Sequence, residues 1–287
     1  MSICYMKELL KEAEKQGRAV GAFSVGNMEM ILGAVKAAEE LNTPIILQIA
    51  EVRLPHSPLH LMGPMMVKAA KEAKVDVAVH LDHGLKISTV KQALDLGFTS
   101  VMFDGSRYDL AENIRLTAEV AAMASRSGAT TEAELGVVGG SEDGSENHEI
   151  VCTDPLVAKR FVGETGVDAL AVAIGNAHGH YVAAPKLRFD ILKQIADAVG
   201  IPLVLHGGTG ISPEDFRRCI TLGIRKINIA TANFDALTEE AGFYFQEPGS
   251  HNYFKLNEAM VRGVYKNVKR HIQIFNNQMP LDQIENA

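Results

Sequence analysis

The sequence predicts an α/β protein, a (β/α)8 TIM barrel with extra C-terminal helices. Short apolar runs, each long enough for one strand, alternate with amphipathic segments of helical periodicity along almost the whole chain. Eight such pairs follow one another within about 230 residues, close to the roughly 250 residues of a usual barrel. No Pro-, Gly- or Ser-rich linker divides the chain. We therefore expect a single domain over residues 1–287, with the barrel at about 19–231 and a helical extension at about 232–287.

In chain order, a helical opening at residues 5–16 precedes eight expected strands, which lie at about 19–23, 44–49, 77–81, 99–103, 130–135, 168–173, 202–206 and 225–229. Helices are expected between and after them at 27–41, 60–74, 87–96, 108–127, 154–164, 187–198, 212–222, 232–241 and 253–275, with a break at Pro248-Gly249. Asp109, with Glu112 three residues on, is a helix start signal, and Gly200 marks a helix end. The alternative fold is a doubly wound open sheet, but no G-x-G-x-x-G motif follows the first strand.

The composition excludes several classes of protein. The chain is 47% hydrophobic and 22% charged, which is typical of globular proteins rather than disordered or fibrous ones. The net charge of −7, without a block of Lys or Arg, argues against nucleic acid and anionic membranes as partners. Three widely spaced cysteines favour neither disulfides nor a cysteine zinc site, and no signal peptide or membrane span is visible. We therefore expect a cytoplasmic protein.

Polar residues gather where the expected strands end. Because barrel enzymes carry their chemistry at the carboxyl ends of the strands, this asymmetry is the most informative feature of the sequence. Six consecutive strands, the third to the eighth, end in or carry HLDHG (80–84), MFDGS (102–106), Glu132 with Glu134, GNAHG (175–179), HGGTG (206–210) and NIAT (228–231).

Three histidines at the ends of different strands suggest a metal site. A lone histidine of this kind is more often a hydrogen-bonded core residue, but three at one barrel mouth favour a catalytic divalent ion. Zn²⁺ is the natural candidate for nitrogen ligands. The three are His83, His178 and His206, whereas His80 is expected in the core or orienting a ligand, and His56, His60, His148, His251 and His271 at the surface.

Carboxylates beside these histidines have two interpretations each. Asp82 precedes His83 and faces the other way in a regular strand, unless the chain has already turned at Gly84. It is either a general acid/base or partner of substrate hydroxyls, or a buried cap of the helix that begins near residue 87. Asp104 and Glu134 are either further metal ligands or residues that orient the histidines, with a structural role nearly as plausible.

Two further segments suggest substrate contacts. The turn at Gly207–Gly210 and the segment Asn228–Thr231 are suited to bind a phosphate through backbone N–H groups and the hydroxyls of Thr209 and Thr231. In barrels, phosphate commonly binds after the seventh and eighth strands. Residues 136–153 form a long Gly-rich, acidic segment that we expect to be a mobile functional loop.

Taken together, these motifs resemble the class II, metal-dependent ketose-bisphosphate aldolases, particularly the branch with tagatose-bisphosphate aldolase and short fructose-bisphosphate aldolases. The matching stretches are AVGAF, HLDHG, VMFDGS, EAELGVVGGSEDG, AVAIGNAHGHY, PLVLHGGTGI and KINIATA, over about residues 19–232. The resemblance implies that His83, His178 and His206 bind Zn²⁺ and that Asp104 and Glu134 lie at a second, inward metal position. It further implies that Asp82 protonates or hydrogen-bonds the aldehyde oxygen and that Glu142 removes the proton from dihydroxyacetone phosphate. The implied phosphate contacts are Gly179, Gly207, Thr209, Asn228 and Thr231, with a monovalent cation nearby.

The implied activity is reversible cleavage of a ketose phosphate, a ketose 1,6-bisphosphate or related ketose 1-phosphate, into dihydroxyacetone phosphate and an aldehyde. The reaction is expected to proceed through a metal-stabilised enediolate. The resemblance also implies that the protein is a homodimer or homotetramer. The chain departs from the family at Ser24, at Ala50–Pro55 after the second strand, and at Ala232-Asn233 after the eighth. Lys255 and Arg262 are candidates for binding a second phosphate, so the aldehyde stays open. One alternative is a class I aldolase, but Lys226 lies at the start of a strand and Lys86 beyond one. Another is a non-catalytic sugar-phosphate-binding or partner subunit on the same fold.

Overall fold

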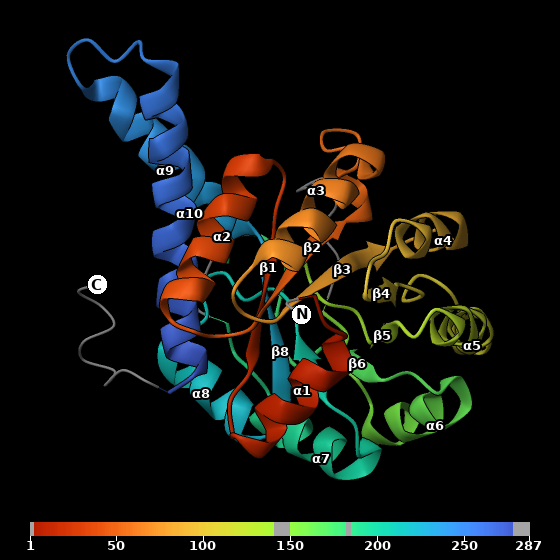
Figure 1. Cartoon of the computed structure of the whole chain (residues 1–287). Coiled ribbons are helices and arrows are strands. Elements are labelled where there is room, and N and C mark those ends of the chain that lie inside the picture. Colours follow the sequence, from red (N-terminus) through yellow and green to blue (C-terminus); the bar gives the residue numbers. More distant parts are fainter. Residues whose placement is uncertain (1–2, 141–149, 182–184, 278–287) are drawn as a thin grey trace.

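The expected barrel is present in the computed structural model, which describes residues 3–140, 150–181 and 185–277 (Figure 1). Eight parallel strands form a closed sheet in the order β1 to β8, with β1 paired to β8. They are β1 Val20–Ser24, β2 Ile45–Ala50, β3 Val77–Gly84, β4 Ser100–Phe103, β5 Thr130–Leu135, β6 Ala169–Val172, β7 Leu203–Leu205 and β8 Ile224–Ile229. All eight predicted strands are confirmed. The largest difference is at β3, which continues to Gly84 instead of ending near residue 81.

Helices cover the outside of the barrel, and their apolar faces make the main core against the strands. They are α1 Met6–Lys15, α2 Met28–Glu40, α3 Leu59–Glu72, α4 Ile87–Asp95, α5 Leu110–Arg126, α6 Pro155–Thr165, α7 Phe189–Val199, α8 Pro213–Thr221, α9 Thr231–Gln246 and α10 Tyr253–Phe275. Sequence signals explain several boundaries: Asp109 caps α5 by accepting from Glu112 N–H, and Gly200 ends α7 with a left-handed φ of 66°. A short 3-10 helix at Glu51–Arg53 was not predicted.

The barrel lumen divides into an apolar lower part and a polar upper part. Alternate residues of a strand point inward, so residues two apart occupy successive layers of the lumen. At the amino ends of the strands the inward side chains are apolar and pack against α1, forming a separate cluster of Met6, Leu9, Leu10, Ala13, Val20, Ala22, Ile46, Ala78, Ala169, Ala171 and Val204. Further along several strands the inward side chains become polar, as with His80, Glu132 and Lys226, all wholly buried. The helix α1 therefore closes one end of the barrel, and the chemistry lies at the other.

The predicted C-terminal helices are α9 and α10, and the chain breaks between them as expected around Pro248-Gly249. They form a hairpin that extends past the barrel (Figure 1). Close contact explains two glycines here: a Cβ on Gly263 would lie 2.0 Å from Ala236 O, and one on Gly33 of α2 would lie 2.7 Å from Val261 O. The long helix α10 thus packs against both α9 and α2.

One histidine prediction is wrong. His271 was expected at the surface, but it is only 4% exposed and packs beside the rings of Phe216 and Phe275. Its Nδ1 donates to Asn267 O at 2.8 Å, which satisfies the polar edge of a ring that otherwise fills an apolar site on α10. The exposure of His56, His60 and His251 is confirmed, and His148 lies outside the described residues. Within residues 3–140, 150–181 and 185–277, no helix has the length and apolarity needed to cross a membrane.

Candidate active site

An irregularity in β3 turns two adjacent residues toward the same space. Up to Leu81 the strand pairs regularly with β4, but the register shifts between Leu81 and Gly84. At His83 the backbone takes a left-handed φ of 41°, which is uncommon for a residue with a side chain. A Cβ at Gly84 would lie 2.5 Å from Met102 O, so only glycine fits after the turn. The chain therefore turns one residue earlier than the sequence suggested, and Asp82 and His83 both reach the barrel mouth.

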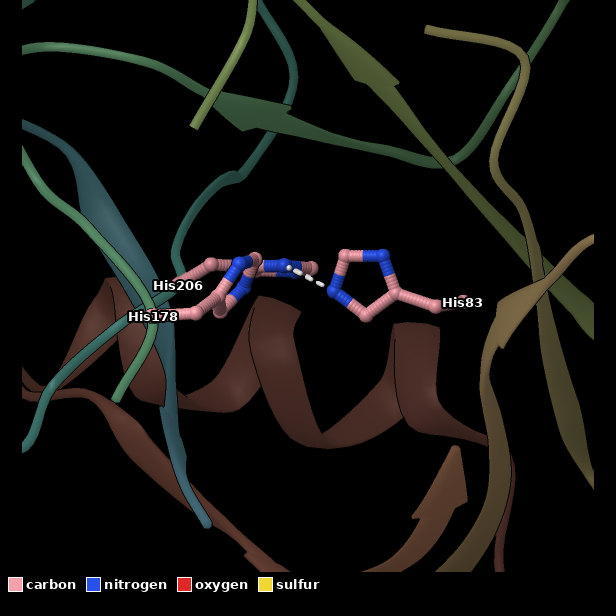
Figure 2. Close-up of side chains that lie close together, drawn as sticks. All are labelled: His83, His178 and His206. Carbon is pink, nitrogen blue, oxygen red and sulfur yellow. Dashed lines mark hydrogen bonds between the residues drawn. The ribbon is translucent and has the colours of Figure 1, made fainter. Parts of the chain in front are cut away.

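Three imidazoles meet at this mouth (Figure 2). The ring of His83 lies 4.9 Å from that of His178 and 4.7 Å from that of His206, between ring centres. One nitrogen of each ring lies within 4.8 Å of one nitrogen of the others. His83 and His206 are buried and His178 is half-buried. The structure thus brings together the three histidines predicted as ligands.

Hydrogen bonds decide which nitrogens of two rings face the centre. His83 Nδ1 lies 2.8 Å from Asp104 Oδ2, and Asp104 is held in turn by Ser106. Burial acts to lower the pKa of His83, but the charges of Asp82 and Asp104 outweigh it and raise that pKa well above its ordinary value. His83 Nε2 is left facing His206 Nδ1 at 2.9 Å.

His206 is fixed from its other side. Its Nε2 lies 2.9 Å from Glu132 Oε1, so Nε2–H donates to the carboxylate and Nδ1 keeps its lone pair. Burial lowers the pKa of His206, which favours this neutral ring. His83 Nε2 and His206 Nδ1 thus face each other while the second nitrogen of each ring contacts a carboxylate, an arrangement typical of histidines that bind a divalent ion such as Zn²⁺. The residues present therefore fit a metal ion.

The two predicted carboxylates contact different histidines of this centre. Glu134 Oε2 is 3.4 Å from His206 Nδ1, and no residue in the described part of the chain hydrogen-bonds to that oxygen. Burial raises the pKa of Glu134. Asp104 instead holds the outer nitrogen of His83, and this contact keeps the pKa of Asp104 well below its usual range although burial opposes it. Glu134 thus lies beside the inward nitrogen of His206, whereas Asp104 orients His83.

Asp82 is enclosed in the lumen by amide donors. Gln48 Nε2 donates to Oδ2 and Asn228 Nδ2 donates to Oδ1, both at 3.1 Å. The alternative role of Asp82 as a cap of α4 is wrong, because its carboxylate is bonded to these two amides and, among the residues that the structure describes, no side chain caps α4. Just before the helix, Glu51 Oε2 accepts from the N–H groups of Leu85 and Lys86 at 2.7 and 3.1 Å.

Comparison with known proteins identifies the family. Residues 4–279 match the family model "Fructose-bisphosphate aldolase class-II". The chain belongs to this family. It is 43% identical over 242 residues to the fructose-bisphosphate aldolase of Geobacillus stearothermophilus, covering 83% of this chain and 84% of that protein. The crystal structure of the YdjI aldolase from Escherichia coli K12 superposes with a TM-score of 0.85 at 34% identity, covering 95% and 97% of the two chains. The protein is therefore a class II aldolase, a carbon–carbon lyase.

The predicted phosphate residues of this class II aldolase lie at or after the carboxyl ends of β6, β7 and β8. The left-handed turn at Gly207 is followed by Thr209, whose Oγ1 accepts from Ala232 N–H at 3.0 Å. This bond joins the loop after β7 to the first turn of α9, which begins at Thr231. The remaining two predicted contacts are Gly179, which follows His178, and Asn228, whose amide is buried beside Asp82. Glu142, the predicted base, lies outside the described residues.

The sequence analysis assigned no site role to two residues that contact this site in the lumen. Glu132, which holds His206, was noted in the sequence only as sharing a face with Glu134. Lys226 was assigned to a strand start, but its ammonium lies inside the lumen, 2.8 Å from Glu132 Oε2. The alternation of side chains along a strand could have indicated these residues, because residues two apart face the same side. His80, Glu132 and Lys226 each precede a predicted site residue by two positions.

Proposed function

We propose that this class II aldolase reversibly cleaves a ketose phosphate, a ketose 1,6-bisphosphate or a related ketose 1-phosphate, into dihydroxyacetone phosphate and an aldehyde through an enediolate. The proposed metal is Zn²⁺, held by His83, His178 and His206. When bound, the ion supplies Lewis-acid polarisation of the ketone and compensates the charge of the enediolate. The convergence of three imidazoles within 4.8 Å carries this proposal.

The remaining roles are assigned to residues around these imidazoles. Asp82 donates a proton to the aldehyde oxygen or hydrogen-bonds it, and the two amides that hold its carboxylate keep it aimed at one place. Glu142 removes the proton from dihydroxyacetone phosphate. The phosphate is bound by Gly179, Gly207, Thr209, Asn228 and Thr231, with a monovalent cation nearby. Glu134 and Asp104 border a second, inward position for the metal, which the open oxygen of Glu134 supports.

A homodimer or homotetramer in the cytoplasm completes the proposal. The α9–α10 hairpin exposes four aromatic side chains, Phe243, Phe245, Tyr253 and Phe254, at 59–73%. A cluster of exposed aromatic residues is typical of a surface that contacts another chain. Of the two candidates for a second phosphate, Arg262 is paired with Glu240 on the same hairpin, and Lys255 is exposed in the first turn of α10.

Exchange of hydrogen at the hydroxymethyl carbon tests the proposal without knowledge of the aldehyde. The protein is incubated with dihydroxyacetone phosphate in D₂O, with and without a chelator, and exchange is followed by NMR. We expect exchange of one of the two hydrogens, abolished by the chelator and restored by Zn²⁺. Absence of exchange in the zinc-loaded protein would contradict the proposed reaction and favour a sugar-phosphate-binding subunit, which a titration with the same ligand then detects.

A further inference from the structure

A wholly buried lysine ammonium lies in the middle of the barrel, where the proposed reaction gives it no part. Lys226 Nζ is 2.8 Å from Glu132 Oε2 and 2.8 Å from Asn228 Oδ1, and the three residues are at most 3% exposed. Both partners have a second contact in the site. Glu132 holds His206, and Asn228 holds Asp82. One cation is therefore linked to both the predicted metal ligand and the predicted acid.

We propose that Lys226 is a positioning residue, an internal cation that orients the Asn228 amide toward Asp82 and the Glu132 carboxylate toward His206. The proposal deepens the proposed function and rests on it for the roles of Asp82 and His206. Lys226 acts along two separate branches of contacts: one runs through the Asn228 amide to Asp82, and the other through the Glu132 carboxylate to His206. Lys226 itself contacts neither substrate nor metal.

The first branch follows from the donors and acceptors of the groups. An ammonium has donors only, so the oxygen of the Asn228 amide must face Lys226. The NH₂ group then faces Asp82 Oδ1 and donates to it at 3.1 Å. Without the ammonium, the amide can rotate and present its oxygen to the carboxylate, which loses one of its two amide donors. Lys226 thus fixes one of the two bonds that aim Asp82.

The second branch concerns the two oxygens of Glu132. Oε2 faces the ammonium and Oε1 accepts from His206 Nε2–H at 2.9 Å, which leaves His206 Nδ1 directed at the other imidazoles. A buried carboxylate without a counter-charge is strongly unfavourable, so removal of the cation forces the lumen to rearrange around Glu132. His206 then loses the acceptor that sets its ring orientation.

Two other roles for the groups around Lys226, a second metal site and a Schiff-base lysine, are less consistent with the contacts. The side chains of His80, Asp82 and Glu132 place ligand atoms within 4.8 Å of one another, as a second metal site would. The ammonium beside Glu132 already supplies the positive charge there. A Schiff-base role would need a neutral amine open to substrate, whereas Lys226 is fully enclosed and engaged at both partners.

The test compares Lys226→Met with the matched surface variant Lys193→Met, which removes only an exposed pair with Asp197 on α7. Thermal unfolding reports folding, the visible spectrum and titration of bound Co²⁺ report the metal centre, and cleavage kinetics report kcat and KM. We expect Lys226→Met to bind Co²⁺ about 10–100-fold more weakly with an altered spectrum, and to lose about 10–100-fold in kcat with little change in KM. Lys193→Met should match the unchanged protein. A Lys226→Met protein that folds with unchanged Co²⁺ affinity, spectrum and kcat overturns the proposal.

A double variant covers the case in which Lys226→Met does not fold. Lys226→Met with Glu132→Gln removes both charges, and the new amide oxygen can still accept from His206 Nε2–H. We expect this protein to fold and to lose kcat through the released Asn228, while its Co²⁺ affinity falls less than tenfold. A folded double variant with kcat within twofold of the unchanged protein overturns the proposal.

The readouts separate failure of this proposal from failure of the proposed function. Absence of chelator-sensitive exchange in the unchanged protein counts against the function, whereas Co²⁺ affinity and spectrum still test the positioning role. Borohydride added with dihydroxyacetone phosphate should leave no adduct on Lys226. A covalent adduct there overturns the positioning role.

Discussion

Gly207 and Ala177 touch where the loops that carry His206 and His178 meet. A Cβ on Gly207 would lie 2.1 Å from the carbonyl oxygen of Ala177, and the backbone at Gly207 is left-handed with a φ of 64°. Tyr181 reinforces this contact, because its hydroxyl accepts from Ala177 N–H and donates to Gly207 O. The spacing of the two predicted metal ligands thus depends on the absence of a side chain at Gly207.

Replacement of Gly207 by Ala should therefore weaken both folding and metal binding. A left-handed alanine costs about 1–2 kcal/mol by itself, and the overlap with Ala177 O adds to this by forcing the loops apart. The matched control is Gly200→Ala, where φ is 66° and nothing lies within 4 Å of the added Cβ. Urea unfolding should show a larger loss for Gly207→Ala, and Zn²⁺ titration should show weaker binding only there. Equal losses for the two variants would contradict this account.

Replacement of His206 by Ala should abolish metal binding and activity together. The change removes one of three converging imidazoles and leaves Glu132 without its partner. Loss of a direct ligand should cost more than the roughly 10–100-fold typical of residues that merely orient one. Equilibrium dialysis with Zn²⁺ and the cleavage assay measure the two effects, with the exposed His60→Ala as control. Full activity in His206→Ala would refute the metal role.

Asp82→Asn should separate the two halves of the reaction. The amide keeps the size of the side chain but cannot donate a carboxyl proton to the aldehyde oxygen, and such a loss typically costs about 10²–10⁴-fold in rate. Cleavage and condensation should fall by this factor, while hydrogen exchange of dihydroxyacetone phosphate in D₂O continues. An exchange rate that falls as far as the cleavage rate would place Asp82 in the other half-reaction.

Glu142→Gln should show the reverse pattern. The variant removes the carboxylate that is proposed to abstract the proton. The residues proposed to hold metal and phosphate stay unchanged. We expect exchange in D₂O to stop while dihydroxyacetone phosphate still binds, as titration calorimetry can show. The neighbouring acid provides the control, since Asp143→Asn should retain exchange. Normal exchange in Glu142→Gln would assign the base to another group.

The buried His271 should make folding stability depend on pH. Burial lowers the pKa of His271 from 6.5 to about 4, so the folded protein keeps the ring neutral. Between these values the unfolded chain binds more protons, and stability is complete above pH 6.5 and falls as the pH drops toward 4. The loss at pH 5 is about 2 kcal/mol. Urea unfolding with a chelator present should show less pH dependence in His271→Leu than in the unchanged protein, with His60→Gln as control. An identical pH dependence in His271→Leu would contradict the assignment.

The strand order and the location of the site were predictable because they depend on local pattern. Each strand has its own apolar run, and the carboxyl ends of parallel strands meet at one mouth whatever the loops do. The meeting of His83, His178 and His206 therefore followed from their place in the sequence.

The remaining features depend on contacts that the linear sequence does not contain. The turn at His83 accompanies the shift in register between β3 and β4 and the close approach of Gly84 to the backbone of Met102. The role of Lys226 depends on Glu132 lying across the lumen, on a strand far away in the chain. Similarly, the helical periodicity of α10 does not show whether His271 faces solvent or the core. Its burial becomes evident only from its contacts with the rings of Phe216 and Phe275.

The distribution of the three imidazoles along the chain also affects when the site can form during synthesis. His83 and His206 are 123 positions apart and belong to different β/α units. Contacts of such sequence separation are slow to form, because the entropy of closing a long loop opposes them. A chain that emerges stepwise from the ribosome therefore has no complete ligand set until β7 and its loop are available. Capture of a metal ion in a timed translation assay would accordingly mark the closing stage of assembly rather than its beginning.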